Sequence, residues 1–385
     1  MRFEFATATR ILFGPGTVAE APAAAAGLGR NALIVTGRNP ERVARLLGEL
    51  RRSGIALSSY AIGGEPTIDD VVRGLAQARH HRCDLVIGFG GGAALDSAKA
   101  IAALLTNPGD PFDYLEVIGR GQALQHSSAP CITIPTTAGT GAEVTRNAVL
   151  ASPVHRLKVS LRSPLMLPRL AIVDPELTHE LAPALTAATG LDALTQLIEP
   201  FVSTRANPLT DALCRDGIPR VARSLRVAVR EGRNATARTE MALASLNGGL
   251  ALANAGLGAV HGLAGPIGGM FPAPHGAVCG VLLPRVMQTN LDALRQRMPE
   301  NTATLARFDE IARLLTADLE ATADEGVRWV TDLVAELPVP RLGTYGISDR
   351  DFTSVAQAAL QASSMKANPI ALTATELEAI LKQAT

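Results

Sequence analysis

The chain has 385 residues, which suggests two domains, and 47% of the residues are hydrophobic, so each domain can bury a core of its own. Lys plus Arg and Asp plus Glu each total 36, which leaves no excess charge for binding nucleic acid or an acidic membrane surface. The scattered cysteines form no CxxC pair, so they indicate neither a disulfide framework nor a cysteine zinc site, and they fit a reducing cytoplasm.

The N-terminal residues lack the basic-then-apolar pattern of a signal peptide, which also favours the cytoplasm. One stretch, residues 241–284, contains no Asp, Glu, Lys or Arg, and its length alone permits a membrane span. Asparagines, prolines and many glycines interrupt it, and a lipid-facing helix tolerates these poorly. We therefore expect buried helices and loops of a soluble core there.

Strands and helices alternate along the first half of the chain. Strands are expected at residues 32–36, 58–62, 84–88, 132–134 and 170–173, helices at 40–50, 67–80 and 93–105, and a hairpin over 146–163 that turns at Ser152 and Pro153. This alternation predicts an α/β, Rossmann-like domain with a parallel sheet over residues 1–178. Helical stretches separated by Pro and Gly then predict an all-α domain over residues 179–385.

Two glycine-containing loops follow predicted strands. The strand at 84–88 leads into Gly90, Gly91 and Gly92, and a helix begins at once. This arrangement suits phosphate, because glycines admit close backbone approach and a helix N-terminus favours an anion. The spacing is not that of the GxGxxG fingerprint, and a tight turn packed for space would look the same.

The second loop covers residues 135–143 and follows the strand at 132–134. Its threonines Thr136, Thr137 and Thr140, beside Gly141, can donate hydrogen bonds to phosphates or ribose. Ligands of open α/β sheets bind at the carboxyl ends of the strands. Two such loops after two parallel strands therefore favour a nucleotide site over a polar surface loop.

These loops and further segments of the sequence resemble the iron-containing alcohol dehydrogenase family. The segments from Gly90 through Asp96 to Lys99 and from Pro135 to Thr145 resemble its two cofactor signatures, and residues 190–199 and 261–276 resemble its metal signatures. Asp174–Pro175 and Asn368–Pro369 also fit, so the resemblance extends over nearly the whole chain. It implies the architecture shared with dehydroquinate synthases, with the site in the cleft between the two domains.

The resemblance also implies roles for individual residues. Gly90, Gly91 and Gly92 are expected to hold the pyrophosphate, and Thr136, Thr137 and Thr140 to contact the phosphates, adenine and ribose. Lys158 matches a lysine that contacts the nicotinamide ribose, although a solvated strand lysine is the plainer interpretation. Asp96 and Gly141 belong to the same signatures. A homodimer or larger assembly is expected.

The coenzyme is expected to be NADP(H) or NAD(H). Many members of the family place an Asp after the first strand, where it binds the adenosine ribose hydroxyls. This chain has Gly37 and Arg38 there and no carboxylate. A nearby Arg suits a 2′-phosphate, so we expect NADPH to be accepted.

The metal ligands implied by the resemblance are one Asp and three His. Asp192, His261 and His275 match, whereas Gln196 stands where a His is expected. Asp192 and Gln196 are four residues apart on a predicted helix and so face the same way. An amide oxygen is a weaker ligand than imidazole for Fe(II) or Zn(II), so the affinity is expected to fall.

A second departure is Gly265, where many relatives carry a His close to the substrate. Proton delivery is then left to His261, His275, water or a ribose hydroxyl. With a metal bound, Asp192, His261 and His275 would support Lewis-acid polarisation of an aldehyde during hydride transfer. Candidates for the substrate pocket are Asn147, Phe201, Phe271 and residues 363–365, and the low aromatic content favours a small or medium, weakly polar aldehyde.

Three alternatives stay open. Maleylacetate reductases share the fold, and some members work without tightly bound metal. Dehydroquinate synthases are lyases that use NAD as a recycled redox helper, although residues 135–145 fit them less well. The third is a cofactor-binding relative that has lost turnover through Gln196 and Gly265.

Overall fold

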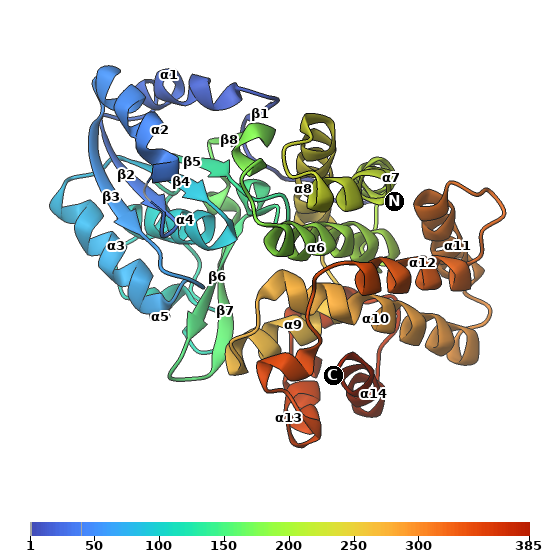
Figure 1. Ribbon diagram of the computed structural model, residues 1–385. Coiled ribbons are helices and arrows are strands. Elements are labelled where there is room, and N and C mark those ends of the chain that lie inside the picture. The colour runs from blue at the N-terminus through green and yellow to red at the C-terminus, as the bar shows by residue number, and fades with distance from the viewer. Residues whose placement is uncertain (1, 40) are drawn as a thin grey trace. The chain divides into compact units, whose positions relative to one another are not determined.

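The computed structural model describes residues 2–39 and 41–385 (Figure 1). The chain forms two compact units. One consists of Ala6–Thr137 and Gly141–Thr178, and the other of His179–Thr385 with Ala138–Thr140 and the N-terminal residues through Phe5. The division between the units lies at the predicted boundary after residue 178, but the N-terminal residues through Phe5 and Ala138–Thr140 group with the second unit.

The first unit, the α/β unit, contains a parallel sheet in the order β1-β8-β5-β4-β2-β3. Its strands are β1 (Ile11–Phe13), β2 (Asn31–Thr36), β3 (Ala56–Ala61), β4 (Leu85–Gly90), β5 (Cys131–Pro135) and β8 (Leu170–Val173). The predicted strands are all present, and the predicted fold class is confirmed. Only β1, three residues long at the edge beside β8, was not anticipated, because so short a segment has no readable period.

Helices cover both faces of this sheet. Helices α1 (Ala21–Ala26) and α2 (Glu41–Arg52) pack on one face, against residues such as Ile34 and Ile87. Helices α3 (Ile68–His80) and α4 (Gly92–Thr106) pack on the other, against Leu33 and Val86, and a short α5 (Pro111–Tyr114) follows. Central strands β2 and β4 are buried on both faces, which explains why they read as continuous apolar runs (Figure 1).

The predicted hairpin is also present, as antiparallel strands β6 (Asn147–Ser152) and β7 (Leu157–Arg162). It is tied to α4 by Asp96, whose carboxylate accepts a hydrogen bond from the Val149 backbone amide at 3.0 Å. Ala148 and Leu150 alternate with less buried residues along β6 and pack into the same apolar cluster as α3 and α4.

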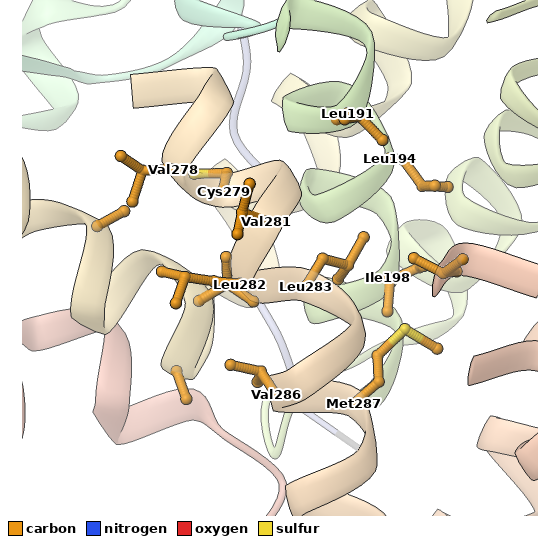
Figure 2. Close-up of a cluster of buried hydrophobic side chains, with 14 of the residues drawn as sticks. Leu191, Leu194, Ile198, Val278, Cys279, Val281, Leu282, Leu283, Val286 and Met287 are labelled. Carbon is orange, nitrogen blue, oxygen red and sulfur yellow. The ribbon is translucent and has the colours of Figure 1, made fainter. Parts of the chain in front are cut away.

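The second unit, the helical unit, has no strand among its described residues. Its helices are α6 (Pro183–Val202), α7 (Pro208–Arg230), α8 (Ala235–Ala255), α9 (Ala259–Met270), α10 (His275–Arg297), α11 (Thr302–Thr316), α12 (Ala323–Glu336), α13 (Asp349–Leu360) and α14 (Ala374–Ala384). Figure 2 shows apolar side chains of α6 and α10, among them Leu191, Ile198 and Met287, gathered in one buried cluster.

The uncharged stretch 241–284 lies within α8, α9 and α10, many of whose side chains belong to this buried cluster. No described helix is by itself long and apolar enough to cross a membrane. Helices α8 and α9 satisfy the length and composition criteria as a pair, but the chain bends by 98° between them.

Candidate functional site

The loops predicted to bind the cofactor lie at the carboxyl edge of the sheet. From the neighbouring pair β2 and β4, the sheet extends to β3 on one side and to β5 and β8 on the other, so the strand order reverses between them. Ligands of open parallel sheets bind outside the strand ends at such a reversal. Gly37 and Arg38 follow β2 there, and Gly91 and Gly92 follow β4.

The glycine loop requires its glycines for close approach. A Cβ on Gly90 would lie 2.8 Å from the Cβ of Ala94 and 3.4 Å from the Gly37 nitrogen, and Gly90 also has a φ of +157°. Gly91 is the N-cap of α4 and brings no capping side chain to the start of that helix. This geometry suits a phosphate group at the helix N-terminus.

The threonine loop adjoins the glycine loop. The Thr136 amide donates to the Gly90 carbonyl at 2.9 Å, and a Cβ on Gly91 would lie 3.4 Å from the Thr137 methyl group. Gly141 has a φ of +59° and starts a short 3₁₀ turn, whereas Thr140 groups with the helical unit. The structure therefore brings together Gly37, Gly90, Gly91, Thr136 and Thr137.

Two other predicted cofactor residues are held by partners in their own unit. Asp96 pairs with the buried Lys99 ammonium at 2.9 Å and also binds the hairpin, so it positions α4 and β6. Lys158 pairs with Glu65 at 2.9 Å, and only 6% of its side chain is exposed, so it is not the solvated lysine of the plainer interpretation. The expected contacts of both residues with a cofactor stay predictions.

Arg38 lies beside the loop that follows β3. A Cβ built on Gly64 would be 3.5 Å from Arg38 Nη2, and one on Gly63 would be 3.6 Å from Arg38 Nε. The guanidinium therefore rests against two glycines at the carboxyl edge of the sheet. This position suits a group that meets a 2′-phosphate on the adenosine side of a dinucleotide.

The predicted metal ligands converge in the helical unit. Asp192, His261, His275 and Cys279 place their ligand atoms within 4.8 Å of one another. Asp192 comes from α6, His261 from α9, and His275 and Cys279 from α10. From Asp192 Oδ1, the Nε2 atom of His261 is 3.4 Å away and that of His275 is 3.8 Å away.

These donors have the character of a metal site. The 3.4 Å separation is long for a hydrogen bond, and within the described chain Asp192 Oδ1 and Gln196 Oε1 are buried without a hydrogen-bond partner. Leaving such atoms unpaired is costly unless something else binds them. The side chain of His261 is 7% exposed and that of His275 is 30% exposed, so access is from the His275 side.

Glu199 orients His261. One carboxylate oxygen lies 2.6 Å from His261 Nδ1, and the other accepts the Val260 amide at 2.7 Å. The neighbouring Ala259 amide donates to Asn368 Oδ1 at 3.0 Å. Helix starts leave amides without partners, and here two side chains from other elements satisfy those of α9. Because Glu199 accepts from Nδ1, the Nε2 atom is the one left to bind a metal.

Electrostatics also favour a cation in this cluster. Burial alone would raise the pKa of Asp192, but His275 and His261 outweigh it and the pKa is lowered, so the carboxylate stays charged. Burial alone would lower the pKa of His261, but the carboxylates of Glu199 and Asp192 raise it well above its usual value. Burial raises the pKa of the Cys279 thiol to about 12, so without a metal the thiol is neutral.

Three further positions singled out in the sequence are Gln196, Gly265 and Phe201. Gln196 lies one turn along α6 from Asp192, as predicted, and is buried. A Cβ on Gly265 would meet nothing within 4 Å, so this position is open. The prediction that Phe201 lines a substrate pocket is wrong, because its ring is fully buried and the guanidinium groups of Arg215 and Arg307 lie 5.3 and 5.0 Å from its centroid.

Sequence reasoning missed Cys279, which belongs to the cluster, and Glu199, which orients His261. Cys279 follows His275 by four residues, a spacing that puts both on one face of a helix, so the signal was present. Glu199 lies at the end of the predicted metal signature, but its role depends on the start of α9, which is distant in sequence. Only folding could reveal that role.

Comparison with known proteins identifies the family of this chain. Residues 8–175 match the model of the family described as iron-containing alcohol dehydrogenase, and residues 186–385 match the C-terminal model of that family. Alcohol dehydrogenase 4 of Schizosaccharomyces pombe is 37% identical over 97% of this chain and 87% of its own length. The 1,3-propanediol dehydrogenase of Klebsiella pneumoniae is 37% identical over 92% of each chain.

Solved structures agree with these matches. A 1,3-propanediol oxidoreductase covers the whole of both chains with a TM-score of 0.92 and 34% identity. An alcohol dehydrogenase from Oenococcus oeni, also over the full length of both chains, gives a TM-score of 0.91 and 32% identity.

Proposed function

Because the chain belongs to the iron-containing alcohol dehydrogenase family, we propose that it interconverts an alcohol and its aldehyde with a nicotinamide coenzyme and a bound metal ion. The family implies NAD(H) and a divalent metal, typically iron. The observation that carries the proposal is the convergence of Asp192, His261, His275 and Cys279 within 4.8 Å. Buried carboxylate and imidazole donors of this kind fit Fe(II) or Zn(II).

The chain's own residues hold and orient the reacting groups. Asp192, His261 and His275 would hold the ion, and Gln196 would face it from the next turn of α6. When bound, the ion acts as a Lewis acid on the carbonyl oxygen and the nicotinamide supplies the hydride. Glu199 keeps the proton of His261 on Nδ1, and burial shields Asp192 and His261 from water.

We propose that NADPH is accepted besides NADH. The support is the position of Arg38 beside Gly63 and Gly64, together with the absence of a carboxylate at residues 36–39. We also propose a small or medium, weakly polar aldehyde as substrate. The position of Met365 supports the proposal that residues 363–365 lie near the substrate, because the Met365 sulfur packs against Gly262, next to His261. A homodimer or larger assembly stays a prediction, which the molar mass measured by light scattering would test. A cytoplasmic location also stays a prediction.

The proposal is tested by loading the purified chain with Fe(II) or Zn(II) and following oxidation of NADH and NADPH with a series of straight-chain aldehydes. The reverse reaction is followed with primary alcohols and 1,3-propanediol. Asp192→Ala should lower kcat/KM by at least about a thousandfold while leaving NADPH binding nearly intact, since Asp192 belongs to the helical unit and the loops with Gly37 and Gly90 belong to the α/β unit. The control is Asp332→Ala, which removes an exposed carboxylate on α12 of the same unit.

Other outcomes would point elsewhere. Full activity in Asp192→Ala would end the metal-assisted proposal, and activity with maleylacetate alone would indicate a reductase of that kind. Tight NADPH binding without turnover on any carbonyl would indicate a binding protein. Continued coenzyme turnover with simple aldehydes would exclude the lyase reaction of the dehydroquinate synthases.

A further inference from the structure

Cys279 lies inside the cluster of predicted metal ligands. Its sulfur is 3.6 Å from His275 Nε2 and 3.8 Å from His261 Nε2. His275 begins α10 and Cys279 follows one turn later, so the two side chains share a helix face. The residue is fully buried.

A buried free cysteine is usually a small apolar core residue, and this chain contains two for comparison. Cys131 and Cys214 are buried in apolar clusters, and Cys279 belongs to the same apolar cluster as Cys214. Among the described residues neither belongs to a group of His, Cys, Asp and Glu that could hold a metal ion, and Cys279 does. The surroundings of Cys279, rather than its burial, set it apart.

As a metal ligand, Cys279 would replace the imidazole that is missing at Gln196. The one-Asp, three-His set implied by the sequence lacks one imidazole, because Gln196 occupies its position. An amide oxygen is a hard, weak donor for Fe(II) or Zn(II), whereas a thiolate is a strong donor for Zn(II). The cluster nevertheless offers four strong donors, since the α10 face supplies Cys279 in addition to His275.

We propose that the Cys279 thiolate is a metal ligand, so that the centre of this chain is an Asp192, His261, His275 and Cys279 set that favours Zn(II) over Fe(II). This inference deepens the proposed function, since it requires that a metal is bound. On binding, the S–H bond breaks, the proton passes to solvent and a sulfur–metal bond forms. No oxidant or reductant is needed.

The test uses Co(II) as the probe, added anaerobically to the full chain after its metal has been removed by a chelator. A thiolate ligand gives Co(II) an intense near-ultraviolet charge-transfer band, which oxygen and nitrogen ligands do not give. We expect this band in the wild-type protein and its loss in Cys279→Ala, with Zn(II) affinity lowered at least about tenfold. The matched control is Cys214→Ala, another fully buried cysteine of the helical unit, which should keep the band and the affinity.

A measurement on the unmodified protein guards against a variant that does not fold. X-ray absorption of the Zn(II)-loaded wild-type chain should show a sulfur scatterer at about 2.3 Å. Gln196→Ala adds a further check, because it should keep the charge-transfer band if Cys279 is the fourth ligand.

Bound Co(II) with no charge-transfer band and no sulfur scatterer would overturn the assignment of Cys279 and leave the metal-assisted function standing. Loss of Co(II) in Gln196→Ala, together with an absent band in the wild type, would place the fourth ligand at Gln196 and overturn it as well. Failure of the wild-type chain to bind either Co(II) or Zn(II) would overturn both this inference and the metal-assisted function.

Discussion

Glu143 is a buried carboxyl group within the threonine loop region of the α/β unit. It is 2% exposed, and nearby Lys99 is fully buried and donates to Thr145 Oγ1 at 2.7 Å. Burial raises the pKa of Glu143 to about 7, against the smaller lowering effects of a backbone hydrogen bond and of Lys99. The folded protein therefore holds a proton there that the unfolded chain releases at lower pH.

This raised pKa predicts a pH dependence of stability. The contribution is fully present below the unfolded pKa of 4.5 and is lost as the pH rises through the folded pKa of about 7. The full change is on the order of 3 kcal/mol. Glu143→Gln should flatten the dependence of the free energy of unfolding between these pH values, as measured by urea titration with circular dichroism.

The control for that experiment is Glu41→Gln, which changes an exposed carboxylate on α2 of the same unit. It should preserve the wild-type profile. An unchanged slope in Glu143→Gln would contradict the assignment of the buried proton to this residue.

Arg38 is the residue that we expect to select the coenzyme. Arg38→Gln should lower kcat/KM for NADPH by about 10- to 100-fold, because a charge-assisted hydrogen bond to phosphate contributes about 1.5–3 kcal/mol. The value for NADH should change little, since NADH has no 2′-phosphate. Steady-state kinetics with both coenzymes measure this, with Arg45→Gln, whose side chain is 87% exposed on α2, as control. Equal losses with both coenzymes would count against this role.

At the scale of elements, the metal cluster depends on how closely α10 approaches α6. A Cβ on Gly276 would lie 2.5 Å from the Ala188 carbonyl oxygen, and one on Gly280 would lie 2.6 Å from Leu191 Cδ1. Both glycines are on α10, four residues apart, and both face α6. The absence of side chains at these two positions lets His275 come near Asp192.

Gly276→Ala should therefore force the two helices apart, because a backbone carbonyl cannot move aside as a flexible side chain can. We expect the free energy of unfolding to fall by about 1–3 kcal/mol. We also expect weaker Zn(II) binding, since His275 and Asp192 lie on the separated helices. Urea unfolding and metal competition titrations report the two effects.

Gly265→Ala is a matched control within the neighbouring helix α9, because its Cβ would meet nothing within 4 Å. It should raise stability by up to about 1 kcal/mol through helix propensity and leave Zn(II) affinity unchanged. If the Gly276 variant behaved like this control, the close packing of α6 and α10 would not matter to the cluster.

At the scale of the whole molecule, the residues proposed to bind the metal ion and those proposed to bind the coenzyme belong to different units. The metal cluster lies entirely within the helical unit, whereas the loops with Gly37, Gly90 and Thr136 lie in the α/β unit. The single tryptophan, Trp329, is in α12 of the helical unit. Its fluorescence therefore reports the unit that should bind the metal.

Zn(II) at 100 times its dissociation constant should stabilise the state reported by Trp329 by about 2.7 kcal/mol relative to chelator-treated protein. The physical reason is that the folded unit brings together donors that are dispersed in the unfolded chain. Urea titrations with and without metal measure this shift. The same shift in Asp192→Ala would show that the metal stabilises the protein at some other place.

Much of the fold was predictable because it depends on local patterns. The apolar runs of β2 and β4 predicted the central strands, and the order of strand, glycines and helix at Gly90–Gly92 predicts a phosphate-binding loop. The positions of Asp192, His261 and His275 could be assigned because their signatures are short and contiguous. The very short β1 escaped prediction, since its pairing with β8 is set by residues about 160 positions away.

The sequence by itself thus determined the fold class, the family and the candidate metal ligands, since periodicity and contiguous motifs are properties of neighbouring residues. Tertiary structure alone decided which side chains from distant segments meet. It placed Cys279 against the His261 imidazole, gave Glu199 both His261 and the start of α9, and buried Phe201 beside two arginines. Glu199 and His261, for example, are 62 residues apart, and packing, not local pattern, brings their helices together.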